Sequence, residues 1–180
     1  MTKKESAQWK CVTQVFKFVS DEAYRQAQNL IPEIATGQID PKSVNGLQEV
    51  QTIEGNILLN EGINNGIWPL VAGDASATPF DNTNARIGVG DGTDPEDATQ
   101  TGLTGLNQAY KGMDAGYPTY GTNQEIVFQA TFGETEANFT WNEWTVDNGA
   151  TAGVNLNRKV ENLGTKSTGT WVLRVSLSLS

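Results

Sequence analysis

The chain has 180 residues, a formal net charge of −9 and no histidine, which excludes the catalytic and zinc sites that depend on an imidazole. Its single cysteine, Cys11, excludes an intramolecular disulfide and a cysteine-rich metal site. At this length, with 37% hydrophobic and 18% charged residues, we expect one domain with an ordinary core.

The charge is distributed unevenly. Residues 74–147 carry twelve acids and two bases, whereas residues 1–25 and 148–180 each carry more bases than acids. This pattern indicates either complementary surfaces that pair between subunits or a solvated acidic surface. We expect no nucleic-acid partner, because nucleic-acid binders present a basic face. We also expect no membrane span and no secretory signal, because no long apolar run occurs and the first ten residues are polar.

In chain order, residues 9–19 come first and are rich in β-branched and aromatic residues, which predicts a strand. Ser20 is a suitable N-cap for a helix whose apolar spacing reaches Ile31, and Pro32 is expected to stop it. Residues 32–52 contain two prolines and two glycines without periodicity. They predict an extended arm that lies over its own domain or over a neighbour.

Residues 53–73 have an apolar stripe that predicts a second helix, ending near Pro69 and weakened by two glycines. From residue 74 the apolar residues alternate with period two, which predicts five or six short strands. The expected strands are centred on residues 85–90, 126–132, 138–146, 156–163 and 170–180, with turns at 91–97, 112–124, 147–155 and 164–169.

In two of these strands the alternation predicts the face on which each residue lies. In 138–146, Trp141 is expected on one face and Trp144 on the opposite one. In 170–180, an apolar face that starts at Trp171 alternates with a polar face. Because this strand ends the chain, we considered that it could be an edge strand that pairs with another subunit.

The predicted fold is mainly β (α+β): an antiparallel β-sandwich or jelly-roll-like domain preceded by a strand, two helices and an extended arm. We place residues 1–52 in the strand, helix and arm. Residues 53–180 are placed in a helix followed by the β-sandwich-like domain.

The acidic loop 91–97 is a candidate calcium site, because its carboxylates are spaced by three and calcium takes oxygen ligands. It lacks the EF-hand pattern, and turn formation explains its residues equally well. Glu143 is a candidate general acid, because an apolar setting between Trp141 and Trp144 would raise the pKa of its carboxyl. The alternative is an ordinary surface residue at a strand edge.

The glycines at 88, 90 and 92 do not match the dinucleotide fingerprint, and the aspartates that follow would repel a pyrophosphate. Trp141, Trp144 and Trp171 could stack on sugars, but packing in the core is the favoured interpretation. Cys11 is expected to be an inert core residue. The sequence therefore assigns no catalytic, cofactor-binding or metal-binding residue, and we expect no cofactor.

Four stretches in a fixed order resemble small virion structural proteins of tailed bacteriophages. They are residues 54–73 (EGNILLNEGINNGIWPLVAG), 85–106 (ARIGVGDGTDPEDATQTGLTGL), 126–146 (IVFQATFGETEANFTWNEWTV) and 156–180 (LNRKVENLGTKSTGTWVLRVSLSLS). The ordered set covers roughly residues 53–180, and the first 50 residues contribute little to it.

The resemblance implies a non-enzymatic assembly role, either as a capsid decoration (cement) protein or as a tail, collar or fibre-base component. It implies a virion location after synthesis in the host bacterial cytoplasm. The implied partners are the major capsid protein or tail and connector proteins, with a homo-oligomer such as a trimer at local three-fold sites. The alternative from another class is a carbohydrate-binding adhesin that recognises a host receptor.

Overall fold

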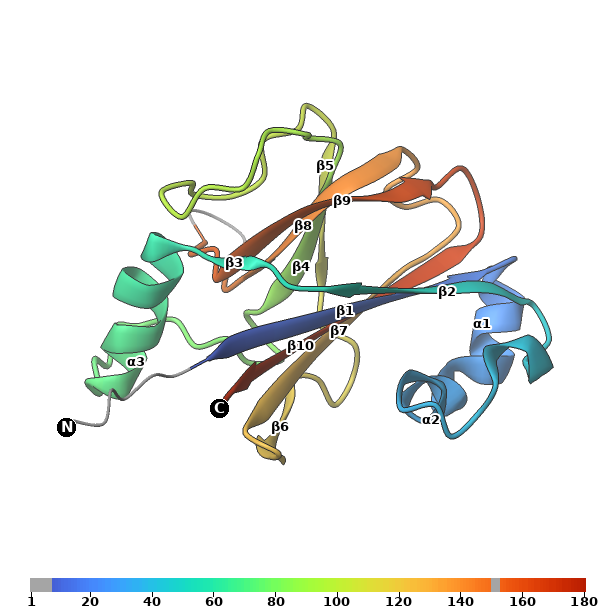
Figure 1. Ribbon diagram of the computed structural model, residues 1–180, viewed down its shortest axis with the longest axis horizontal. Helices are drawn as coiled ribbons and strands as arrows, with labels where there is room; N and C mark the ends of the chain where they lie inside the picture. Colours follow the sequence, from blue (N-terminus) through green and yellow to red (C-terminus); the bar gives the residue numbers. More distant parts are fainter. Residues whose placement is uncertain (1–7, 150–152) are drawn as a thin grey trace, which may run out of the picture.

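Two five-stranded antiparallel sheets pack face to face in the computed structural model, which describes residues 8–149 and 153–180 (Figure 1). The first sheet has the order β2 (Leu47–Glu54), β1 (Trp9–Phe18), β10 (Thr170–Leu179), β7 (Glu125–Phe132) and β6 (Thr119–Thr122). The second has the order β3 (Ile57–Leu58), β9 (Asn157–Thr165), β8 (Thr140–Asp147), β4 (Arg86–Gly90) and β5 (Gln108–Gly112). The predicted antiparallel β-sandwich is confirmed.

The main core lies between the two sheets. Its buried side chains come from alternate positions of the facing strands, as a half-buried strand requires. In β10, for example, Leu173, Val175 and Leu177 are at most 2% exposed. The inward face predicted for this strand is therefore confirmed, although the terminal Leu179 is exposed.

A layer of short helices covers one end of the outer face of the first sheet. It consists of α1 (Asp21–Ala27), the 3-10 turn η1 (Gln28–Leu30) and α2 (Ile31–Ala35) (Figure 1). The Ser20 side chain accepts a hydrogen bond from Ala23 N at 3.1 Å, so the predicted N-cap is confirmed. Pro32 does not end the helical segment, because it lies in the first turn of α2, where a proline needs no N–H partner.

Residues 32–52 lie over their own domain rather than reaching towards a neighbour. After α2 and the 3-10 turn η2 (Pro41–Ser43), the chain forms β2, which pairs with β1. Since β1 itself pairs with β10 along its whole length, residues 1–52 and 53–180 contribute to the same sheet.

The helix expected over residues 53–73 is much shorter than the sequence pattern indicates. Ile57 and Leu58 form β3 and pair with β9, and helical structure runs only from Asn60 to Val71. This part contains the π-helical turn η3 (Gly62–Ile67) and α3 (Trp68–Val71), whose first turn includes Pro69. Gly55, with φ of 78°, turns the chain out of β2 and so prevents a helix from starting there.

Strand β10 occupies the centre of its sheet, between β1 and β7, so the edge-strand hypothesis for residues 170–180 is wrong. The backbone groups on both edges of β10 are paired, and both of its faces are covered as well. Val172, on the face opposite the core, is completely buried beneath the helices. A strand at the end of a chain is not obliged to lie at the edge of a sheet.

Two further strands lie where the sequence predicted no strand. Strand β5 pairs with β4, and β6 falls within the turn expected at 112–124. All four residues of β6 are exposed, so they have no apolar alternation from which a strand could be recognised. No helix among the described residues has the length and apolar character needed to cross a membrane.

Candidate functional site

Glu143 follows an irregularity in the pairing of β8 with β9. Trp141 lies opposite Gly164 and Glu143 lies opposite Val160, so four positions of β9 span two positions of β8, and the extra residues belong to β9. Trp141 and Trp144 both lie in the core between the sheets, so the prediction that they lie on opposite faces is wrong.

Glu143 is completely buried. It is therefore neither a surface residue nor a general acid that a substrate could reach. Its carboxylate accepts hydrogen bonds from the backbone N–H groups of Gly92, Thr104 and Gly105, at 3.1, 3.0 and 2.7 Å. It also forms an ion pair with Arg158, whose Nη2 lies 2.7 Å from Oε2. With its acceptor sites occupied in this way, the carboxylate has no free position for a substrate proton.

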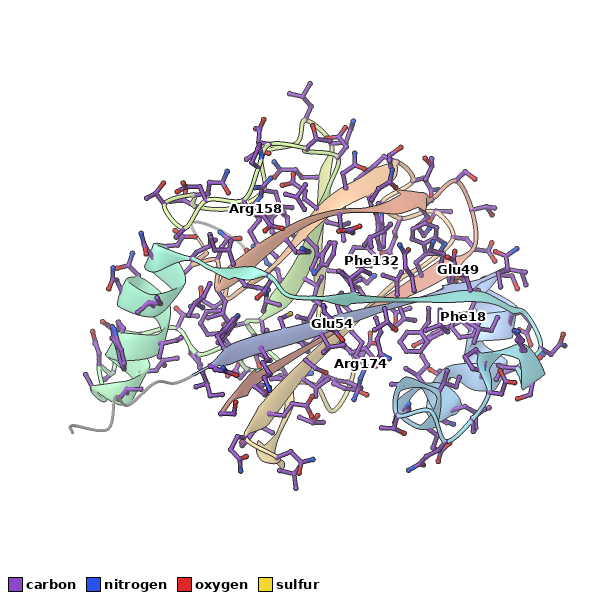
Figure 2. All side chains as sticks on the ribbon, in the orientation of Figure 1. Phe18, Glu49, Glu54, Phe132, Arg158 and Arg174 are labelled. Carbon is purple, nitrogen blue, oxygen red and sulfur yellow. The ribbon has the colours of Figure 1, made fainter. Side chains whose placement is uncertain are left out.

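Arg158 is also completely buried and holds the other side of the same loop (Figure 2). Its Nη1 donates to the carbonyl oxygen of Asp94 at 3.0 Å and to Gln100 Oε1 at 2.8 Å. Its Nη2 donates to Thr104 Oγ1 at 3.0 Å. The sequence gives no indication of this residue, because an arginine in a weakly alternating strand carries no local sign of burial.

The pair formed by Glu143 and Arg158 therefore fixes the long loop between β4 and β5. This arrangement satisfies the buried charges with hydrogen bonds from many directions, which is the condition under which a buried ion pair is tolerated. Its chemical effect is to hold the loop in one conformation.

The glycines of β4 and the following loop have a steric role at the same place. A Cβ atom at Gly90 or Gly92 would lie 2.5 or 2.4 Å from Glu143 Oε1, and one at Gly88 would lie 2.5 Å from the Tyr110 ring. The alternating glycines are therefore needed to let the buried carboxylate and the aromatic ring approach the backbone.

The aspartates of loop 91–97 have separate partners. Asp91 accepts from the Asn107 backbone N–H at 3.0 Å, and Asp97 accepts from the Thr99 N–H at 2.8 Å. Hydrogen bonds from the Asn107 and Thr99 side chains lower the pKa of the respective carboxyls. Within residues 8–149 and 153–180, no three carboxylate or cysteine side chains gather closely enough to hold a metal ion.

The tryptophans proposed for sugar stacking are core residues. Trp141 and Trp144 are 0% exposed and Trp171 is 7% exposed, so the packing interpretation is confirmed and the stacking interpretation is wrong. The indole N–H groups of Trp141 and Trp144 donate to the Ala137 carbonyl and to Thr13 Oγ1, at 2.9 and 3.1 Å. These bonds satisfy the polar atoms of the two buried rings.

Cys11 is buried in the same core, as predicted. Burial raises the pKa of its thiol to about 11. The thiol therefore remains protonated at neutral pH, and a protonated, buried thiol is unreactive.

A second polar cluster lies on the outer face of the first sheet, where the sequence analysis found no candidate. It joins Tyr24 of α1, Asp114 and Tyr117 of the loop after β5, and Gln129 of β7 around a pocket of about 410 Å³. These residues are separated by as many as 105 positions in the chain, so no local motif could have indicated them.

No known protein family matches the chain, and neither a curated protein nor a solved structure has a significant match to it. Function has to be inferred from the chain's own residues and from their arrangement.

Proposed function

We propose that the chain is a non-enzymatic structural component of a tailed-bacteriophage virion. Among virion positions we favour a capsid decoration protein that stabilises the head by bridging neighbouring subunits. The observation that supports this proposal is that the four stretches that resemble virion proteins meet in one structural unit.

The buried ion pair connects three of those stretches. Glu143 comes from residues 126–146 and Arg158 from residues 156–180, and together they bind the loop within residues 85–106. A resemblance spread over separate stretches is more informative when those stretches are packed together, because their order and spacing then serve one fold.

The remaining stretch, residues 54–73, joins the same unit through its helical turn. Glu61 Oε1 accepts a hydrogen bond from Asn155 N at 2.8 Å. The backbone at Gly62 packs so closely on Leu156 that an added Cβ would lie 2.5 Å from its carbonyl oxygen.

In a decoration role the chain would act mechanically, by burying surface across the joints between capsid subunits. Large apolar side chains are available for this on several elements: Trp68 and Val71 of α3 are 57% and 72% exposed, and Tyr120 of β6 is 80% exposed. Exposed apolar and aromatic side chains of this kind are typical of interface cores. They replace the arm and the terminal strand as the contact surfaces that we propose.

The first experiment is immunogold electron microscopy of purified virions of the phage that encodes the chain. The antibody should be raised against the whole folded chain, because a fragment of residues 74–180 would lack β1, the partner of β10. Antibody pre-absorbed with the purified protein is the control. Gold over the whole head supports decoration, and gold at one vertex or on the tail supports a tail, collar or fibre-base component instead. Absence of gold with an accessible epitope rejects the virion proposal.

A second experiment tests the proposed contact surface. Tyr120→Ser is expected to weaken binding to heads that lack the protein by about ten-fold or more, the loss that corresponds to a buried large side chain. Thr122→Ser is the matched control, because it changes an exposed residue of the same strand and removes only a methyl group. Unchanged binding of Tyr120→Ser would show that β6 does not face the capsid.

A further inference from the structure

The outer face of the first sheet carries a polar pocket between the helical layer and the loop of residues 113–118. Its volume of about 410 Å³ lies in the range of small-molecule sites. The residues that line it are Tyr24, Gln28, Asn29, Pro32, Asp114, Ala115, Tyr117 and Gln129. We call it the tyrosine pocket.

The lining of the pocket includes a fixed carboxylate. Asp114 Oδ2 accepts hydrogen bonds from Gln129 Nε2 at 3.0 Å and from Thr131 Oγ1 at 2.8 Å, which leaves Oδ1 available to a ligand. Gln129 is only 5% exposed, and its buried Oε1 has no hydrogen-bond partner among the described residues. Because Nε2 faces the carboxylate, the amide cannot be reversed to pair this oxygen without placing it against Asp114. The protein therefore leaves one buried acceptor unsatisfied beside the pocket.

The aromatic walls are also held in place. Arg174 Nη1 donates to the hydroxyl of Tyr117 at 3.0 Å, and Asn82 Nδ2 donates to the carbonyl oxygens of Asp114 and Tyr117 at 2.9 and 2.6 Å. On the other side, Tyr24 OH lies 3.1 Å from Thr131 Oγ1. A site whose groups are fixed before binding loses little conformational entropy when a ligand arrives.

The combination of groups selects the ligand class. A carboxylate accepts hydrogen bonds from hydroxyl groups, side-chain amides both accept and donate them, and the tyrosines of the lining offer apolar ring surface to the C–H groups of a sugar. The carboxylate in the lining and the chain's net charge of −9 disfavour an anion. We propose that the tyrosine pocket binds a neutral pyranose sugar. This inference does not depend on where the chain lies in a virion.

The test is a titration of the ¹⁵N-labelled full chain, followed by NMR, with galactose, glucose and N-acetylglucosamine and with N-acetylneuraminic acid as the anionic probe. We expect at least one neutral sugar to shift the side-chain amide signals of Gln129 and Asn29 saturably, and N-acetylneuraminic acid to leave them unchanged. The methyl glycosides then distinguish two sources of the sugar. If a methyl glycoside binds as tightly as the free sugar, the ligand is the terminal residue of a glycan. If it does not bind, the ligand is a free sugar. If no neutral sugar moves these signals, or if the anionic sugar binds more tightly, the proposal is overturned.

Two variants connect binding to the pocket. Ala115→Trp should fill the pocket from an exposed loop position and abolish the shifts, whereas Ala75→Trp, an identical change at an exposed position outside the lining, should leave them intact. Asp114→Asn removes the charged acceptor and is expected to weaken binding at least about ten-fold. The assignment of the site is overturned if Ala115→Trp and Asp114→Asn both bind the sugar as the parent chain does. It is also overturned if Ala75→Trp loses binding as fully as Ala115→Trp.

Discussion

At the scale of single residues, the ion pair between Glu143 and Arg158 holds the loop between β4 and β5 in place. Both side chains are completely buried, and three backbone N–H groups of a distant loop point at the carboxylate. Removing one partner of such a pair leaves an uncompensated charge in a low-dielectric interior, which is far more costly than losing an exposed pair.

We therefore expect Glu143→Gln to lower the free energy of unfolding by about 3–5 kcal/mol. The control is Glu96→Gln, which removes a partly exposed carboxylate 3.5 Å from Lys159 and should cost about 1 kcal/mol or less. Urea unfolding followed by tryptophan fluorescence measures both. Equal losses in the two variants would contradict the special role of the buried pair.

Cys11 gives the stability an alkaline pH dependence. Burial raises the pKa of its thiol from 9.0 to about 11, so between these pH values the unfolded chain releases a proton that the folded chain retains. The free energy of unfolding must then fall as the pH rises from 9 to 11, by about 2 to 3 kcal/mol from this group.

Cys11→Ala should remove that contribution. The variant will be less stable at neutral pH because it leaves a cavity, but its stability should decline less steeply between pH 9 and 11 than that of the parent chain. Urea unfolding at a series of pH values measures the two slopes, and the tyrosines, which titrate in both proteins, cancel in the comparison. If the free energies of unfolding of the two proteins fall with pH at the same rate, the pKa of the thiol is not raised in the folded chain.

At the scale of elements, packing between the two sheets shields three tryptophans from solvent. Trp141 and Trp144 pack in the core with Trp171, whereas Trp68 of α3 is 57% exposed and Trp9 is partly buried. Iodide should therefore quench only a minor fraction of the tryptophan fluorescence. Trp68→Phe should remove most of that quenchable fraction, while Trp171→Phe should leave it in place. Strong quenching that survives the combined change of Trp9 and Trp68 to Phe would show that iodide reaches the core tryptophans.

At the scale of the whole molecule, the two ends of the described chain lie side by side in one sheet. Strand β1 pairs with β10 from Trp9 opposite Leu179 to Phe18 opposite Thr170. The sandwich closes only when residues more than 150 positions apart meet, and β10 supplies inward residues to the main core and Val172 to the helical layer.

Deletion of residues 171–180 should consequently unfold the protein, because it removes the central strand and exposes both neighbours. Deletion of residues 179–180 alone, which include the exposed Leu179, should leave a cooperative thermal transition with a modest reduction in Tm. Circular dichroism during heating distinguishes the two. A folded protein without residues 171–180 would contradict the central position of β10.

The sequence by itself determined the features that depend on neighbours in the chain. The alternation in residues 170–180 predicted which side chains of β10 face the core, the residues of β1 predicted a strand, and Ser20 predicted the start of α1. Together with the turn residues, these local patterns sufficed for the fold class, because a two-residue or helical period depends only on backbone geometry.

Only the tertiary structure decided how those elements combine. The central place of β10, the burial of Glu143 and Arg158 and the assembly of the tyrosine pocket each depend on partners that are distant in the chain. The physical reason is that burial and pairing are set by which surfaces meet, and an acidic or basic residue has the same local pattern whether it meets water or an opposite charge.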